Sequence, residues 1–567
     1  MKSSSGIRLL PWMLLLVAAA EPAAQPIVKD ASERAKIEAA LPSKALAEPR
    51  KGRKLLIFNL NVNYGGHPSA AHASYAFSLM GQKTGAFATV ISREASVFKP
   101  ESLRQFDAVF LNNTVGNLFE DPQLRQSLME FVCAGGGLLG VHGTSVAFTQ
   151  WPGAKEDWPE FGVMIGARGA NHRNSDEHVF IKLDDPEHPL NQAFGGKGFD
   201  YRDEFFRVHE PYSRDRVRVL FSIDMGKTDA SEGGAARGNA FRADNDYALA
   251  WVRNYGGGRV FYCTIAHNPS VFWDPQMLRF YLGAIQFALG DLPAPTTPSS
   301  RLTRAIRAQE KLGWRLGIEA GVFQKSTLFE AIDSTAKLGL LYIGGLSSQK
   351  VSREITSDFG PELSDDVLRQ VRMKLDAAGV RLLTYHVRQM PGDEAGCRRV
   401  FEFARKMGIE TLISEPTPES LGTIERFCDE YDVKLAIYGR DGNAWPDSWD
   451  PEAVLRVCQG RSKRIGVCGD LGQWMQNGVD PIKAIRLLKD RLITVRMHDR
   501  NQLGKEGQDV LWGTGVGQTE QFVREMRALG IAPTMFAVEY SREAAEAMPE
   551  IGRCVEFFNK LGMQMAE

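Results

Sequence analysis

The sequence predicts two successive α/β domains, a doubly wound parallel sheet followed by a (β/α)8 barrel. Three observations support this. The chain has 567 residues, well beyond the size at which a single hydrophobic core stops growing. Its first half alternates apolar, strand-like runs with helical patterns, which is typical of parallel βαβ units. Its second half repeats a strand-then-helix pattern eight times, the number that a (β/α)8 barrel requires.

The chain begins with a pattern typical of a secretory signal. Lys2 and Arg8 precede an apolar run at 9–20, and small residues after it offer cleavage sites. We therefore expect a signal peptide over 1–24 and export, most simply to a bacterial periplasm. The run is short for a membrane span, so we expect no stable insertion after cleavage; an uncleaved anchor is the alternative. Residues 25–52 are rich in Ala, Pro and charge and predict a tether.

The first domain is expected over residues 53–290. Apolar runs predict its parallel strands, and periodic segments between them predict helices, such as 122–134. Several short strand-like runs between 178 and 262 predict added antiparallel strands. A helix at 275–289 completes the domain. The predicted parallel strands are 55–60, 88–92, 108–112 and 138–142.

Proline and small polar residues at 291–300 mark a break between the domains, so we expect a linker over 291–311. The barrel is expected over 312–567. Several of its predicted helices end at a glycine just before the next strand, as helices commonly do. The eight predicted strands are 315–320, 340–345, 381–387, 411–416, 434–439, 464–470, 492–499 and 535–540.

Composition narrows the range of partners. The net charge is -1, which gives no electrostatic footprint for nucleic acid, so a small or neutral ligand is the better expectation. The seven cysteines lack paired spacing. They suggest neither a zinc motif nor a disulfide framework.

Four histidines follow predicted strands or loops of the first domain: His67, His142, His172 and His267. Ligands of open parallel sheets collect beyond the carboxyl ends of the strands. With the carboxylate of Glu204, these histidines predict a polar pocket suited to acid/base chemistry or metal binding. Each histidine taken alone is equally compatible with a structural role.

The first domain resembles the ThuA-like (trehalose utilisation) family. The resemblance covers about 53–290 and is carried by GGGLLGVHGTSVAF, WPEFGVMIGARGANH, DDPEHPL, DEFF and ALAWVRNYGGGRVFYCTIAH. It implies a flavodoxin-like fold related to class I glutamine amidotransferases, and a link to sugar utilisation. Such amidotransferases need a thiol nucleophile at the elbow after a strand. Here His142 holds that place and Cys133 lies in the preceding predicted helix, so we expect no glutaminase activity.

The barrel has carboxylates at the ends of three predicted strands, Glu415, Asp470 and Glu539. Catalytic residues of such barrels lie at these ends. The segments KRIGVCGDLGQW, ITVRMHD, DVLWGTGVGQ and FAVEY resemble the xylose-isomerase-like sugar isomerase/epimerase barrels, related to endonuclease IV, over about 312–565. The resemblance implies a divalent metal held by these three carboxylates and by the residue at 496.

Position 496 is Arg496, which offers no lone pair to a cation. Our preferred hypothesis is that Arg496 acts as a fixed cation that neutralises the three carboxylates in place of the metal. A metal site rebuilt with His498 or His386 is the alternative. Other departures from the resemblance are Gly344, where an acidic residue is common, Arg440 and Gln473. We expect Arg440, Gln473 and His498 to bind substrate.

These features predict a protein of carbohydrate metabolism that acts on sugars or keto-sugars. If the barrel is active, the expected reaction begins with proton abstraction beside a carbonyl and gives isomerisation, epimerisation or elimination. Glu415 and Glu539 are the candidate bases, with Asp470 and Arg496 completing the site. The alternative is a non-catalytic carbohydrate-binding barrel that supports the ThuA-like domain.

Overall fold

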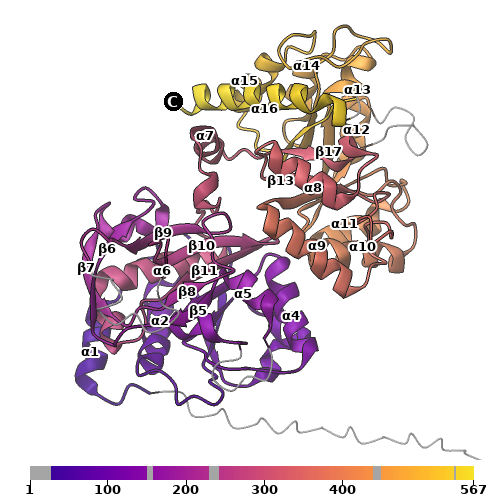
Figure 1. Cartoon of the computed structure of the whole chain (residues 1–567). Helices are drawn as coiled ribbons and strands as arrows, with labels where there is room; N and C mark the ends of the chain where they lie inside the picture. Colours follow the sequence, from indigo (N-terminus) through magenta and orange to yellow (C-terminus); the bar gives the residue numbers. More distant parts are fainter. Residues whose placement is uncertain (1–26, 150–156, 229–241, 439–448, 542–543) are drawn as a thin grey trace, which may run out of the picture.

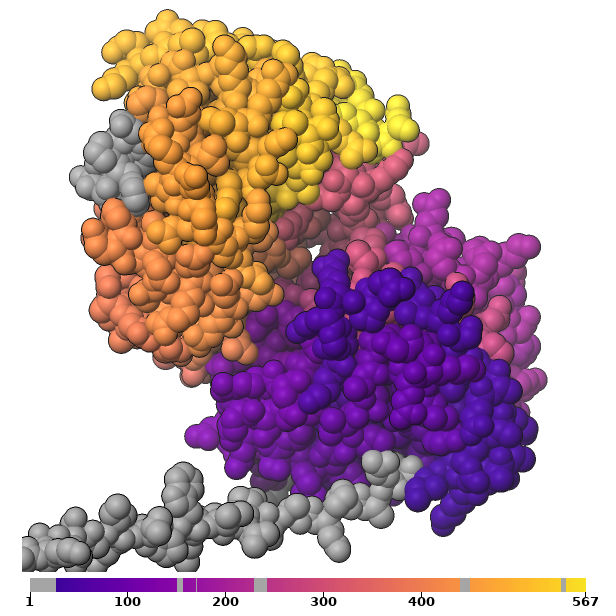
Figure 2. All heavy atoms as spheres, turned by 180° about the vertical axis from the view of Figure 1, so that it is seen from behind, coloured from indigo at the N-terminus to yellow at the C-terminus, as the bar shows by residue number. Residues whose placement is uncertain are grey.

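The computed structural model describes residues 27–149, 157–228, 242–438, 449–541 and 544–567, and these form two domains (Figure 1). The first is built on a nine-stranded sheet and the second is a closed eight-stranded barrel, which confirms the predicted fold class. Seen from behind, the domains are two lobes in contact (Figure 2). The expected signal peptide and Arg440 lie outside the described residues.

Five parallel strands make one half of the first sheet and four antiparallel strands extend it. The run at 258–263 was expected to form one of the added antiparallel strands. It instead pairs in parallel with the strand at 137–141. The parallel half is, in spatial order, β2 (Ala88–Ser92), β1 (Lys54–Phe58), β3 (Ala108–Leu111), β4 (Gly137–Val141) and β11 (Gly258–Cys263). The extension is β10 (Ala248–Tyr255), β9 (Arg218–Ile223), β6 (Glu177–Leu183) and β7 (Phe199–Asp203), and a separate ribbon pairs β5 (Arg168–Asn171) with β8 (Arg207–His209).

Helices cover the inner parallel strands β1, β3, β4 and β11, which are largely buried, whereas the edge strand β2 is partly exposed. The most deeply buried helix is α6 (Pro275–Leu289), which packs on β4 and β11 and begins at an Asp274 cap. An aspartate at this position accepts the otherwise unpaired N–H groups of the first turn. The other α-helices of this domain are α2 (Ala70–Thr84), α3 (Pro100–Leu103), α4 (Pro122–Cys133) and α5 (Pro159–Ile165).

Residues 25–52, expected to form a tether, are packed against the domain where they are described. Helix α1 (Ala31–Ala40) buries Ile37 completely, and Glu33 pairs with His72 of α2 at 2.9 Å. The backbone N–H of Leu46 donates to the side chain of Gln286 in α6. The composition of 25–52 predicted a tether. In the described part of this segment, however, buried apolar side chains such as Ile37 anchor it to the domain.

The second domain is a barrel in which every strand pairs in parallel with the next, and the last pairs with the first. Its strands are β12 (Leu316–Glu319), β13 (Tyr342–Leu346), β14 (Arg381–His386), β15 (Thr411–Ser414), β16 (Lys434–Ile437), β17 (Ile465–Asp470), β18 (Leu492–Met497) and β19 (Phe536–Val538). Its helices are α8 (Leu328–Lys337), α9 (Asp365–Ala378), α10 (Glu394–Met407), α11 (Leu421–Tyr431), α12 (Pro451–Cys458), α13 (Leu471–Gln476), α14 (Pro481–Leu488), α15 (Thr519–Ala528) and α16 (Ala544–Ala566).

The segment predicted as a linker contains a further helix, α7 (Arg304–Leu312), which packs along α16. Glu310 of α7 accepts two hydrogen bonds from Arg218 of β9, so this helix contacts both domains. Among the described helices, none has the length and apolar character needed to cross a membrane.

The two domains meet where β10 of the first sheet ends and at the amino-terminal side of the barrel. Arg253, near the end of β10, pairs with Asp376 at the end of α9, and Arg381 donates to Asn254 at 3.2 Å. Arg372 of α9 and Glu160 of α5 form a buried pair at 3.0 Å. The interface lies at the turn between β10 and β11, which is the amino-terminal end of β11 and of the strands parallel to it. The carboxyl ends of these strands, and those of the barrel strands, therefore point away from the interface.

Candidate functional sites

A sharp elbow after β4 organises the site of the first domain. The strand ends at Val141, and His142 opens a 3-10 turn, η2 (His142–Val146), with a φ of 41°. This left-handed conformation is uncommon for a residue with a side chain and is concentrated at functional sites. Gly143 leaves room for a close neighbour, because a Cβ there would lie 2.6 Å from the ring of His67. The elbow therefore brings His67 and His142 into ring contact, with centroids 4.8 Å apart.

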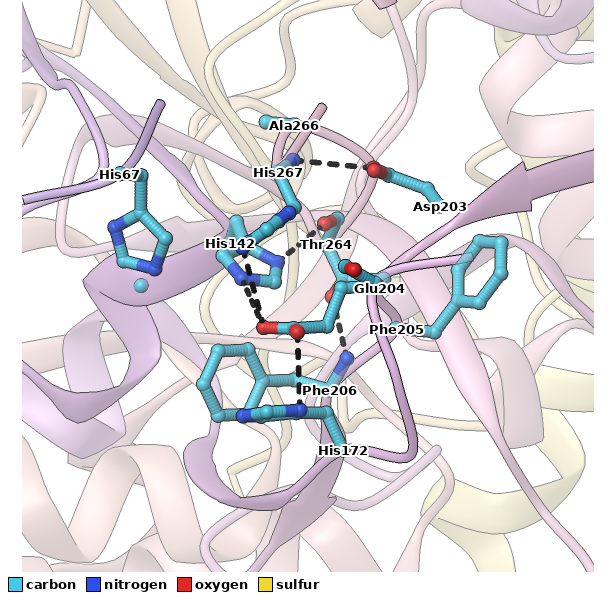
Figure 3. A network of polar contacts seen from close by, with 12 residues as sticks. His67, His142, His172, Asp203, Glu204, Phe205, Phe206, Thr264, Ala266 and His267 are labelled. Atoms are coloured by element: carbon cyan, nitrogen blue, oxygen red, sulfur yellow. Dashed lines mark hydrogen bonds and ion pairs between the residues drawn. The ribbon is translucent and has the colours of Figure 1, made fainter. Parts of the chain in front are cut away.

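Glu204, just after β7, is the centre of this cluster (Figure 3). His142 Nε2 lies 3.3 Å and His267 Nε2 lies 3.7 Å from its Oε1, while His172 Nδ1 lies 3.2 Å from its Oε2. His67 completes the group beside the rings of His142 and His267. The structure thus brings together all five residues that the sequence singled out in this domain.

Hydrogen bonds behind the rings fix their orientation. His142 Nδ1 lies 2.9 Å from the carbonyl oxygen of Thr264, and His267 Nδ1 lies 3.3 Å from Oδ1 of Asn268. The carboxylate of Asp203 accepts the backbone N–H groups of His267 and Asn268, which holds the segment after β11 in place. The sequence analysis did not predict a role for Thr264 or Asn268.

Burial sets the charges of this cluster. It lowers the pKa of His67 to about 2, assisted by repulsion from His142 and His267, and it also lowers the pKa of His142. Burial alone would raise the pKa of Glu204, but its histidine neighbours, first His142, bring that pKa below the ordinary value. Burial therefore favours the neutral forms of the His67 and His142 rings.

Cys133 does not replace the missing elbow thiol of an amidotransferase. It ends α4 and is fully buried against Met129. Burial raises the pKa of its thiol to about 12, which removes the thiolate that a nucleophile needs. The site of this domain is accordingly built from histidines and carboxylates.

In the barrel, Arg496 of β18 lies between two carboxylates at the carboxyl ends of the strands. Its Nη1 is 3.2 Å from Glu539 Oε1 and its Nη2 is 3.7 Å from Glu319 Oε2. The guanidinium carbon also lies 4.2 Å from the centre of the Tyr438 ring, a cation–π arrangement. Arg496 therefore supplies the positive charge at this place.

Glu319 is the residue that the sequence analysis missed. It is the last residue of β12, so the strand-end rule that identified the other carboxylates applied to it as well. Gly344 explains its position: a Cβ at 344 would lie 2.4 Å from Glu319 Oε2, so the glycine leaves space for this carboxylate. Burial raises the pKa of Glu319 to about 7, although Arg496 acts in the opposite direction. Thr384 Oγ1 donates to it at 3.2 Å.

Asp470 lies in a second charged group of the barrel. It accepts hydrogen bonds from the Tyr438 hydroxyl at 3.1 Å and from the backbone N–H of Gln473 at 2.9 Å. His498 Nε2 lies 3.7 Å from Asp470, and His498 Nδ1 lies 3.1 Å from Asp509. Burial opposes protonation of this ring, but Asp470 and Asp509 raise the pKa of His498 to about 9.

The other predicted barrel residues lie near the same end. Glu415 directly follows β15 and is half-buried, and Gln473 lies in α13. His386 ends β14, with its ring 5.6 Å from that of Tyr438.

The divalent metal implied for such barrels does not fit this donor set. The guanidinium of Arg496 already lies against Glu319 and Glu539, and a protonated His498 faces Asp470. Among the described residues of the barrel, no three His, Cys, Asp or Glu side chains lie close enough to share an ion. The charges of this site are balanced by cationic side chains.

Residues 54–288 match the protein family described as Trehalose utilisation, ThuA. The first domain is therefore a ThuA domain, as its sequence predicted, and it is followed by a (β/α)8 barrel. No curated protein matches the sequence.

Several solved structures are similar to parts of the chain. An uncharacterised protein from Parabacteroides distasonis is 28% identical, covers 44% of this chain and 99% of its own, and gives a TM-score of 0.37. A ThuA-like protein from Bacteroides uniformis is 19% identical over 43% of this chain and 94% of its own, with a TM-score of 0.35. A D-tagatose 3-epimerase-like protein is 16% identical over 43% of this chain and 98% of its own, with a TM-score of 0.34.

Proposed function

We propose that this chain is an exported protein that acts on sugars or keto-sugars at the carboxyl ends of its barrel strands, with Arg496 in place of a divalent metal. One observation carries the proposal: the guanidinium lies between Glu319 and Glu539 and stacks on Tyr438. A fixed guanidinium offers several N–H donors to hydroxyl and carbonyl oxygens without needing an ion. The ThuA domain supports the link to sugars.

The proposed reaction begins with removal of a proton from the carbon beside a sugar carbonyl. Glu539 or Glu415 accepts this proton, and Arg496 stabilises the negative charge that develops on the carbonyl oxygen. Return of a proton to another carbon or to the other face gives isomerisation or epimerisation, whereas loss of a neighbouring hydroxyl gives elimination. Burial raises the pKa of Glu319 to about 7, so both its acid and its carboxylate form are accessible near neutral pH.

A second candidate function is carbohydrate binding without turnover. The charge balance of the site favours it, because Arg496 and a protonated His498 already neutralise carboxylates that would otherwise act as bases. In this case the barrel holds a neutral sugar by hydrogen bonds and supports the ThuA domain.

Calorimetry with a panel of sugars and keto-sugars, followed by proton NMR of the bound ligands in heavy water, separates these candidates. An active barrel incorporates deuterium beside the carbonyl, with or without a chelator. Of Glu539→Gln and Glu415→Gln, the variant that lacks the base abolishes this exchange while its dissociation constant stays within about tenfold. The matched control is Glu520→Gln, which changes an exposed carboxylate paired with Arg524.

Each result has one meaning. Binding without exchange in the wild-type protein favours the second candidate. Absence of both binding and exchange contradicts both candidates. Loss with a chelator of the exchange that depends on Glu539 or Glu415 contradicts the metal-free barrel site. Mass spectrometry of the mature protein tests export, because cleavage near residue 24 is expected.

A further inference from the structure

The cluster in the ThuA domain directs nitrogen lone pairs at a carboxylate. The carbonyl of Thr264 can only accept a hydrogen bond, so His142 Nδ1, 2.9 Å away, carries the proton of the neutral ring. The lone pair is then on Nε2. That atom is buried, has no hydrogen-bond partner among the described residues, and lies 3.3 Å from Glu204 Oε1.

His267 shows the same arrangement. The amide nitrogen of Asn268 donates to the carbonyl of Ser175 at 2.6 Å, which fixes the amide so that its oxygen accepts from His267 Nδ1. The lone pair of His267 is therefore also on Nε2, which lies 3.7 Å from Glu204 Oε1.

Three acceptors thus converge with no proton between them. The nitrogens of His142 and His267 and an oxygen of Glu204 all lie within 4.8 Å of one another. Such a grouping is unfavourable in a buried site, because none of these three atoms can donate a hydrogen bond to another. A cation at the point where they converge satisfies all three.

We propose that His142, His267 and Glu204 bind one divalent transition-metal ion, with zinc as the best fit. Two imidazole nitrogens and a carboxylate oxygen form a known ligand set of catalytic zinc sites. Tetrahedral zinc with bonds of about 2.0–2.1 Å holds its ligand atoms about 3.3 Å apart, close to the two distances from Glu204. The bonds from the rings to Thr264 and Asn268 are the outer contacts that orient metal-binding histidines.

Three protein ligands leave a fourth position for water or a substrate oxygen. His172 marks the open side of the site, since its side chain is 31% exposed and its Nδ1 lies 3.2 Å from the other oxygen of Glu204. His67 borders the site from the elbow side. The expected ligand class is therefore a hydroxyl or carbonyl oxygen, such as that of a sugar. This inference does not depend on the proposed barrel function.

The test uses the full-length protein. After loading with zinc and removal of the excess, elemental analysis is expected to give about one zinc per chain, and cobalt in its place is expected to give the visible absorption of a tetrahedral site. Glu204→Gln and His267→Ala are expected to weaken zinc binding, measured against a chromophoric chelator, by more than about tenfold. The matched control is His178→Ala, because His178 is a half-exposed histidine of the same domain that pairs with Asp200.

Circular dichroism establishes that each variant is folded. If His267→Ala fails to fold, Glu204→Gln carries the test, since it keeps the size of the side chain. A folded wild-type protein that binds neither zinc nor cobalt stoichiometrically overturns the proposal. Wild-type affinity in folded Glu204→Gln also overturns it, because the metal must then bind elsewhere.

Discussion

Arg496 and Glu319 show how single residues set the chemistry of the barrel. A charge at the barrel centre must be balanced. Here the guanidinium of Arg496 in β18 lies against Glu539, which follows the adjacent strand β19, and against Glu319 of β12, the next strand around the closed sheet. Gly344 and Glu319 are complementary, because the absence of a side chain at Gly344 leaves room for the carboxylate of Glu319. Arg496 therefore places a positive charge among these carboxylates as part of the fold.

Arg496→Met is expected to lower the free energy of unfolding by about 3 kcal/mol, because it leaves buried carboxylates without their partner. Urea unfolding measures this difference. Arg353→Met is the control, since Arg353 is 81% exposed in its pair with Glu330 and should change stability by about 0.5 kcal/mol or less. A loss for Arg496→Met as small as that of the control would show that the cluster is not stabilised by the guanidinium.

The pair of His498 and Asp509 predicts a pH dependence. The folded pKa of His498, about 9, lies above its ordinary value of 6.5, so its contribution to stability is complete below pH 6.5 and is lost as the pH rises through 9. Asp509, with a pKa lowered to about 2, contributes above its ordinary value of 3.8 and loses this contribution as the pH falls through 2.

The midpoint of thermal unfolding should therefore fall between pH 6.5 and pH 9 in the wild-type protein, and it should fall less in His498→Gln. Differential scanning fluorimetry across this range measures the effect, with His178→Gln as a control because that ring is half exposed. Parallel curves for the wild-type protein and His498→Gln would contradict the assigned charge of His498.

At the scale of elements, the elbow between β4 and η2 is the feature on which the ThuA site depends. It places His142 in a left-handed conformation and brings its ring to those of His67 and His267. The elbow thus presents an imidazole whose Nδ1 is held by the carbonyl of Thr264.

Gly143→Ala is expected to displace His67 and to lower stability by about 1–3 kcal/mol, because its Cβ would lie 2.6 Å from the His67 ring and 2.9 Å from Val115. If the metal proposal holds, zinc affinity should change as well, since the neighbouring elbow residue is a ligand. Gly65→Ala in the loop before His67 is the matched control, because no atom lies within 4 Å of a Cβ there. Equal stability of the two variants, measured by urea unfolding, would contradict the close approach.

For the whole molecule, the arrangement of the domains keeps the two sites apart. The turn after β10 contacts the amino-terminal side of the barrel, so the His142 cluster and the Arg496 cluster lie at opposite ends of the molecule. Direct transfer of a ligand from one site to the other within one chain is therefore disfavoured. The domains are expected to bind their ligands independently.

The interface itself depends on buried ion pairs. Asp376→Ala leaves Arg253 and Arg216 without their shared carboxylate, which is expected to cost about 3–5 kcal/mol and to separate the unfolding of the two domains. Scanning calorimetry should then resolve two transitions. The control, Asp358→Ala, removes a carboxylate that is 54% exposed in its pair with Lys350 and should leave the wild-type profile. A profile for Asp376→Ala that matches the control would contradict this role.

The sequence by itself determined the two folds and the elements that build them. Strands and helices follow from local periods of apolar residues, and the positions of His142, Asp470 and Glu539 follow from the rule that ligands bind where parallel strands end. The same rule applied to Glu319, the last residue of β12, but the sequence analysis did not select it.

Only the tertiary structure decided which of these groups meet. The pairing of Arg496 with Glu319 depends on strand neighbours that are far apart in the sequence, and the packing of α1 depends on contacts with α2 and α6. The tautomers of His142 and His267 depend on oxygens supplied by the segment after β11. The local sequence sets the apolar periodicity of each helix or strand and the points at which it ends. The contact partners, tautomers and charge pairs of the side chains depend on distances between elements, which a linear pattern does not contain.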